Sequence, residues 1–200
     1  MKKQLTVLLV LFAMSTLLFT KCRNKENESG KETAAATANF GGYDSQVKWG
    51  EHLITSGGCG DCHTPKKMTP MGPADDSSLL LSGQPSQMPL PDVNRLEMQS
   101  KGLVVSQTFT QWIGPWGISF AANLTSDSTG IGMWKEEQFI YALRNGITKG
   151  MAGSRPMLPP MPWPALRNRT DDELKAMFAY LKTIKPIKNV VPPPQPPVTK

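Results

Sequence analysis

The chain has 200 residues and a formal net charge of +6. This charge does not indicate nucleic-acid binding, because no stripe of basic residues with interleaved aromatic side chains occurs. In addition, three of the positive charges are expected to be removed with the N-terminal segment, so the exported part is less basic. These are Lys2, Lys3 and Lys21, which precede any expected cleavage point. The length suits one folded domain, and 17 glycines and 18 prolines predict long ordered loops between a few helices.

The N-terminal segment predicts export. Lysines followed by a short apolar run are typical of a secretory signal peptide, here residues 1–21, and the run is short for a membrane span. Cys22 follows directly and resembles the lipidated cysteine of a bacterial lipoprotein, although Lys21 stands where a small residue is usual. An uncleaved signal anchor and an incidental cysteine are the alternatives. Either anchor predicts a periplasmic-side, membrane-attached protein, and polar residues 22–42 predict a flexible tether.

The first helix is expected over residues 43–56. Apolar side chains recur there at helical spacing, among them Leu53 and Ile54, and two glycines at 57–58 form a stop signal. His52 lies on this helix and is expected to be an exposed surface residue.

The next five residues, Cys-Gly-Asp-Cys-His beginning at Cys59, carry the clearest chemical signal. Two thiols at this spacing can add to the two vinyl groups of a haem, and His63 then becomes an axial ligand of the iron. A thioredoxin-like site would need a strand before Cys59, and a four-ligand zinc site would need a second ligand pair beyond Cys22 and His52. The motif therefore predicts one covalent haem c, attached at Cys59 and Cys62.

Beyond the motif, residues 64–111 are rich in proline, methionine and polar residues and predict a long wrapping loop that can contain a short strand pair or helix. A second helix is expected over 135–145, with acidic residues in its first turn. A third is expected over 170–183, because a capping box opens it at Thr170. Residues 191–200 form a Pro-rich tail, expected to be a spacer or a disordered end.

Between the last two helices, repeated prolines block helix formation and predict a stiff loop that can present a methionine at small entropic cost. Met161, within Leu-Pro-Pro-Met-Pro-Trp, is the main candidate for the sixth iron ligand, and Met157 is the alternative. Iron held by histidine and methionine is coordinatively filled, which suits an electron carrier. An open sixth position would instead indicate a haem enzyme or a gas sensor.

Several motifs have counterparts in one family. They are GGCGDCHTP at 57–65, the run with Asn-Leu-Thr-x-Asp and Thr-Gly-Ile-Gly-x-Trp at 123–134, Ala-Leu-Arg-x-Gly at 142–146, Pro-Pro-Met-Pro-Trp at 159–163 and Ala-Tyr-Leu at 179–181. On these motifs the chain resembles the class I c-type cytochromes. It is particularly similar to the haem domains in cytochrome subunits of membrane-bound alcohol, aldehyde and gluconate dehydrogenases. Those subunits usually repeat the haem motif three times, whereas here it occurs once.

The resemblance implies an all-α class I cytochrome c fold, with about three main helices around one haem and a long loop insertion at 64–111. It implies thioether bonds at Cys59 and Cys62, and it implies His63 and Met161 as the axial ligands.

The resemblance also implies that Gly50 lets Tyr180 pack closely where the first and last helices cross. The cytochrome domain would cover residues 43–190 and act as a one-electron carrier, not as an enzyme. Its partners would be redox proteins, such as a dehydrogenase, an oxidase or another cytochrome. The N-terminal lipid or anchor would reach the membrane, and no nucleic acid would be bound.

Overall fold

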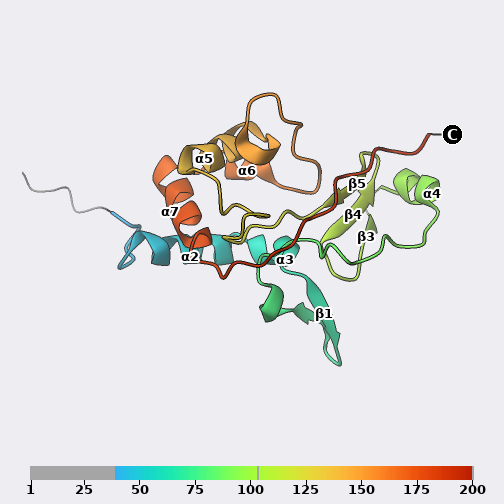
Figure 1. Ribbon diagram of the computed structural model, residues 1–200, viewed down its shortest axis with the longest axis horizontal. Coiled ribbons are helices and arrows are strands. Elements are labelled where there is room, and N and C mark those ends of the chain that lie inside the picture. The colour runs from blue at the N-terminus through green and yellow to red at the C-terminus, as the bar shows by residue number, and fades with distance from the viewer. Residues whose placement is uncertain (1–38, 103, 200) are drawn as a thin grey trace, which may run out of the picture. The chain divides into compact units, whose positions relative to one another are not determined.

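A computed structural model describes residues 39–102 and 104–199. The predicted signal segment 1–21, Cys22 and most of the predicted tether lie outside these residues. Within the described part, no helix combines the length and the apolar character that crossing a bilayer requires. The helices are α2 (Gln46–Ser56), α3 (Cys59–His63), α4 (Arg95–Ser100), α5 (Glu136–Asn145), α6 (Trp163–Leu166) and α7 (Asp171–Leu181) (Figure 1). The strands are β1 (Lys66–Thr69), β2 (Gly72–Asp75), β3 (Val104–Val105), β4 (Gln111–Gly114) and β5 (Gly117–Phe120).

The prediction of an all-α fold is wrong. The described residues contain two antiparallel sheets, one made of β1 and β2 and one with the strand order β3-β4-β5. Most of the strand residues lie in the 64–111 segment, which also carries α4 and for which a long loop with a short strand pair or helix was predicted. The strands have only two to four residues each, too few for an alternating apolar pattern to be visible in the sequence. The sheets are therefore specified by pairing between segments rather than by local periodicity.

The three main helices were predicted correctly. A capping box opens α7, because Thr170 Oγ1 accepts from Glu173 N while the Glu173 carboxylate accepts from Thr170 N. Gly146 ends α5 in the left-handed region, with φ of 62°, a conformation that glycine adopts without a Cβ penalty.

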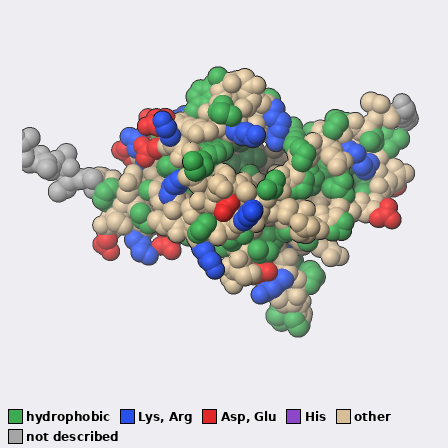
Figure 2. All heavy atoms as spheres, in the orientation of Figure 1, with side chains coloured by type: hydrophobic (Ala, Val, Ile, Leu, Met, Phe, Trp, Pro, Cys, Tyr) green, Lys and Arg blue, Asp and Glu red, His purple; other side chains and the backbone are tan. Residues whose placement is uncertain are grey.

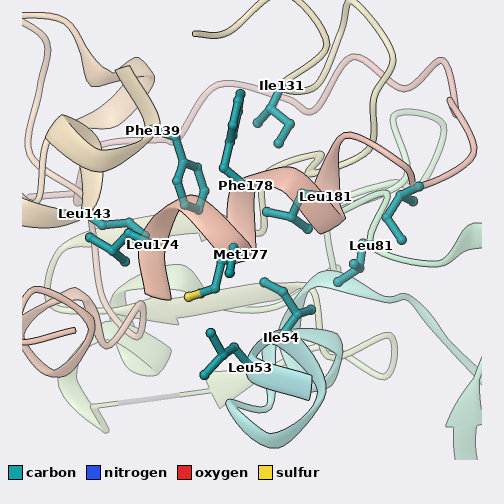
Figure 3. Close-up of a cluster of buried hydrophobic side chains, with 12 residues drawn as sticks. Leu53, Ile54, Leu81, Ile131, Phe139, Leu143, Leu174, Met177, Phe178 and Leu181 are labelled. Carbon is teal, nitrogen blue, oxygen red and sulfur yellow. The ribbon is translucent and has the colours of Figure 1, made fainter. Parts of the chain in front are cut away.

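The core lies between α2, α5 and α7 (Figure 3). Phe139 of α5 and Phe178 of α7 pack with their ring centroids 5.4 Å apart. Leu81 and Ile131 reach the same cluster from the segments between helices. Other buried members of the cluster are Leu53, Ile54, Leu143, Leu174, Met177 and Leu181. Burial of these apolar side chains is the main force that holds the helices together.

The crossing of α2 and α7 depends on Gly50, as the resemblance implied. A Cβ added at Gly50 would lie 1.9 Å from the carbonyl oxygen of Ala176 and 2.9 Å from Tyr180 Cβ. Both distances are far below van der Waals contact, so only glycine permits this approach of the two helices.

Replacing Gly50 with alanine is therefore expected to destabilise the fold. Overpacking typically costs about 1–3 kcal/mol, which outweighs the roughly 0.5–1 kcal/mol gained from alanine's helix propensity. Thermal unfolding followed by circular dichroism is expected to show a melting temperature lower by roughly 4 °C or more. Gly60→Ala is the matched control, because its Cβ would meet only Thr64 Oγ1 at 3.6 Å and an Asp75 carboxylate oxygen at 3.9 Å. An unchanged melting temperature for the Gly50 variant would contradict the close crossing.

The Pro-rich tail does not extend away as a spacer over its described residues 191–199. Gln195 pairs with Ile118 of β5 through two backbone hydrogen bonds, with N···O distances of 2.9 and 3.0 Å. The Arg95 guanidinium of α4 donates to Gln195 Oε1 at 3.1 Å and to the Pro196 carbonyl at 2.7 Å. In Figure 1 the tail, drawn in red, runs beside β5 toward α4. The tail is thus part of the three-stranded sheet region.

Candidate haem site

The haem motif forms its own short helix directly after α2. Gly57 ends α2 by donating to the Leu53 carbonyl at 3.0 Å, and Gly58 turns the chain with φ of 66°. Residues three and four apart lie on the same face of a helix. On α3 this spacing brings Cys59 together with Cys62 and with His63. Two thiols and one imidazole therefore share a single helical turn.

The ring of His63 is held in one orientation. The side chain is 8% exposed, and Nδ1 lies 2.8 Å from the Ala122 carbonyl oxygen. Burial lowers the pKa of His63, which favours the neutral ring. A carbonyl only accepts hydrogen bonds, so Nδ1 carries the proton and the Nε2 lone pair is free to bind a metal.

Nε2 of His63 is not fully enclosed by the described residues. No hydrogen bond from a described residue reaches it, and it is not among the buried polar atoms that lack a partner, which belong to Gln84, Arg95 and Gln111. This arrangement fits an axial ligand of haem iron, because Nδ1 is fixed by a backbone acceptor while Nε2 stays available.

The Ala122 carbonyl is positioned by two segments that run side by side. Gln84 N donates to the Ala121 carbonyl at 3.0 Å, and Leu124 N donates to the Leu81 carbonyl at 2.9 Å. Gly83 N donates back to the His63 carbonyl at 2.8 Å. The orientation of the imidazole therefore depends on chain that lies far from the motif in sequence.

The two motif cysteines are half-buried and are not joined by a disulfide. Burial raises the pKa of Cys59 to about 11, and it also raises the pKa of Cys62. Redox-active cysteines need a lowered pKa so that the thiolate is present, and these thiols have the opposite shift. Among residues 39–102 and 104–199, no group of three or more His, Cys, Asp or Glu side chains could hold a metal ion, so a zinc site has no ligand set there.

Lys66 supports the motif, and the sequence analysis missed it. Its Nζ donates to the carbonyls of Gly60 at 2.9 Å and Thr64 at 2.8 Å, and it pairs with the Asp75 carboxylate at 2.7 Å. Its side chain is only 11% exposed. A cation favours the carbonyl-rich end of a helix, so a lysine three residues after the motif was the available signal.

Met161 lies beside the core. It is half-buried and packs against the apolar cluster, and Met157 and Cys59 contact the same cluster. Burial alone therefore does not separate the two methionines as iron ligands.

Figure 2 shows the surface hollowed between the part that carries α5 and α6 and the part that carries β4 and β5.

His52 is exposed, as predicted, and stacks on Tyr43 with the ring centroids 5.0 Å apart. It lies on α2.

No protein-family model matches the chain. The chain is 28% identical over 152 residues to the gluconate 2-dehydrogenase cytochrome c subunit of Pantoea cypripedii, a match that covers 76% of this chain and 26% of that protein. It is 29% identical over 174 residues to the alcohol dehydrogenase (quinone), cytochrome c subunit of Gluconobacter oxydans, covering 81% and 28%. It is 39% identical over 75 residues to the fructose dehydrogenase cytochrome subunit of Gluconobacter japonicus, covering 36% and 15%.

These names confirm the predicted resemblance to cytochrome subunits of dehydrogenases. They agree with an electron carrier rather than a catalytic chain, and they support haem c as the cofactor. The chain spans less than a third of the length of each of these relatives.

Proposed function

We propose that the chain is a cytochrome c with one covalent haem, which carries single electrons between redox proteins. The observation that carries this proposal is the protonated Nδ1 of His63 on the Ala122 carbonyl, which leaves Nε2 free on the same helical turn as two thiols. The similarity to cytochrome subunits of gluconate, fructose and alcohol dehydrogenases supports it independently.

In this proposal Cys59 and Cys62 hold the haem by thioether bonds, and His63 and Met161 are the axial ligands. The haem, when bound, supplies a one-electron couple. His63 is fixed by Ala122 so that its Nε2 points away from the hydrogen-bonded side of the ring. A methionine at the sixth position keeps small molecules away from the iron, and the apolar cluster beside Met161 excludes water. The haem held by these residues would supply electron transfer to a partner protein, and no substrate would bind at the iron.

The proposal extends to the whole chain. Residues 1–21 act as an export signal, 22–42 as a tether, 43–190 as the cytochrome domain and 191–200 as a Pro-rich tail. Lipidation at Cys22 anchors the protein on the periplasmic side of a membrane. The redox partner is a dehydrogenase, an oxidase or another cytochrome. The names of the relatives, which are subunits of dehydrogenases, support the first of these.

Optical spectra of the purified exported protein test the proposal. We expect one covalent haem c per chain, a weak far-red sulfur-to-iron band in the oxidised form, and no change when carbon monoxide is added to the reduced form. Covalent haem that lacks the band and binds carbon monoxide would instead indicate a haem enzyme or gas sensor with an open sixth position. Absence of haem from correctly exported protein would contradict both.

A further inference from the structure

The loop that carries Met161 has few backbone groups with which to fix itself. Proline has no N–H, so Met161 supplies the single backbone donor between Pro159 and Pro162. That donor reaches the Leu158 carbonyl at 3.3 Å, which is long for an N–H···O hydrogen bond. The position of this loop must therefore depend on groups outside it.

Ser119 supplies such a group. It lies in β5, is 6% exposed, and its Oγ donates to the Pro159 carbonyl at 2.6 Å. The same Oγ accepts from the indole Nε1–H of Trp116 at 3.1 Å, which orients the hydroxyl. The indole itself lies tightly over Gly114, where an added Cβ would meet the ring at 2.4 Å. A fixed chain of hydrogen bonds thus runs from Trp116 through Ser119 to the carbonyl two residues before Met161.

The same stretch of chain also holds the other proposed axial ligand. Ala122 accepts from His63 Nδ1–H, and Ala122 follows Ser119 by three residues. Three residues of extended chain span about 10 Å at most. The carbonyl that orients His63 and the hydroxyl that holds the Met161 loop are therefore set by one short segment, residues 119–122.

This segment is itself braced. Ile118 pairs with Gln195 of the tail, and a Cβ at Gly117 would lie 2.1 Å from the Gln195 carbonyl oxygen, so the tail lies directly on the hairpin turn. On its other side, β5 pairs with β4 from Gln111 to Gly114. Strand β5 is therefore held along both of its edges, which makes Ser119 a fixed anchor.

We propose that Ser119, oriented by Trp116, is a positioning residue that holds Met161 in place as the sixth ligand of the haem iron. This inference rests on the proposed ligation by His63 and Met161. It assigns a role to the β4–β5 hairpin, an element that no helix-only cytochrome domain would need.

The test compares Ser119→Ala with wild type as loaded protein. Loss of one hydrogen bond is expected to raise the population of the methionine-detached state roughly tenfold. The expected results are a weaker far-red sulfur-to-iron band, roughly tenfold faster carbon monoxide binding by the reduced form, and a lower midpoint potential. Ser119→Thr, which restores a hydroxyl, is expected to recover all three. Trp116→Phe, which removes the N–H together with part of the indole ring, is expected to shift them in the same direction by less.

Ser126→Ala is the matched control. Its hydroxyl also donates to a backbone carbonyl at 2.6 Å, that of Ile184, which is not part of the Met161 loop. It is expected to lower thermal stability while leaving the band and the carbon monoxide rate unchanged. If the wild type shows the band but folded Ser119→Ala and Trp116→Phe match it in band and rate, the role of Ser119 is overturned while the proposed ligation stands. A wild type without the band would overturn the ligation, and the proposal with it.

Discussion

Replacing Met161 with alanine is expected to make the reduced protein bind carbon monoxide readily. The reduced wild type is expected not to bind it. Met161 is the proposed sixth ligand, so its removal is expected to leave one position on the iron open. Its side chain is half-buried beside the core. Loss of the thioether ligand also removes its preference for reduced iron. The midpoint potential is expected to fall by on the order of 0.1 V, within the roughly 0.8 V that axial ligands span. Redox titration and carbon monoxide difference spectra measure both effects.

Met157→Ala is the matched control for this variant. Met157 packs against the same apolar cluster and is also half-buried, so both substitutions remove similar packing. The Met157 variant is expected to keep the far-red band and to remain unreactive toward carbon monoxide. If instead Met157→Ala opens the iron and Met161→Ala does not, the sixth ligand is Met157.

Replacing Cys59 and Cys62 together with alanine is expected to abolish covalent haem entirely, because no packing contact substitutes for a thioether bond. Haem staining after denaturing electrophoresis is expected to be lost. Each single variant is expected to keep one thioether bond and a haem-stained band with an altered spectrum. Cys22→Ala serves as the control, since this third cysteine lies outside the motif. It is expected to stain as strongly as wild type. Haem that stays attached in the double variant would contradict the assignment.

The sequence predicted those parts of the fold that local patterns specify. The helices α2, α5 and α7 have an apolar face and recognisable end signals, and these features act within a few residues. The close approach at Gly50 followed from the resemblance and is confirmed by the 1.9 Å distance to the Ala176 carbonyl oxygen. By contrast, β4 and β5 are four residues each and are defined by their pairing. Pairing energy is a tertiary property, so the three-stranded sheet was missed, whereas the strand pair β1–β2 lies in the segment where a short strand pair or helix was considered.

The residues of the candidate site were likewise predictable only where local sequence spacing identifies them. The haem motif could be recognised because its three functional residues lie within five positions of the sequence: Cys59, Cys62 and His63. The acceptor that fixes His63 is a backbone carbonyl 59 residues away, and every residue of the chain has such a carbonyl. The sequence around Ser119 likewise does not indicate a role, because its hydrogen bond to the Pro159 carbonyl forms only in the folded protein. A residue whose role comes from a contact across the fold therefore has no recognisable pattern in the sequence around it.

The pairing of the tail with β5 has a consequence for self-association. The outer edge of a strand is a template on which another copy of the chain can add a strand, and it is a common origin of aggregation. Here that edge is occupied by Gln195, through its N–H and its carbonyl toward Ile118. Prolines stand on both sides of Gln195, at 192–194 and at 196–197, and they offer no N–H to a further strand. The C-terminal residues thus cover the β5 edge of the sheet with proline-rich chain that offers few N–H groups to a further strand. A protease that trims them would expose this edge to other copies of the chain.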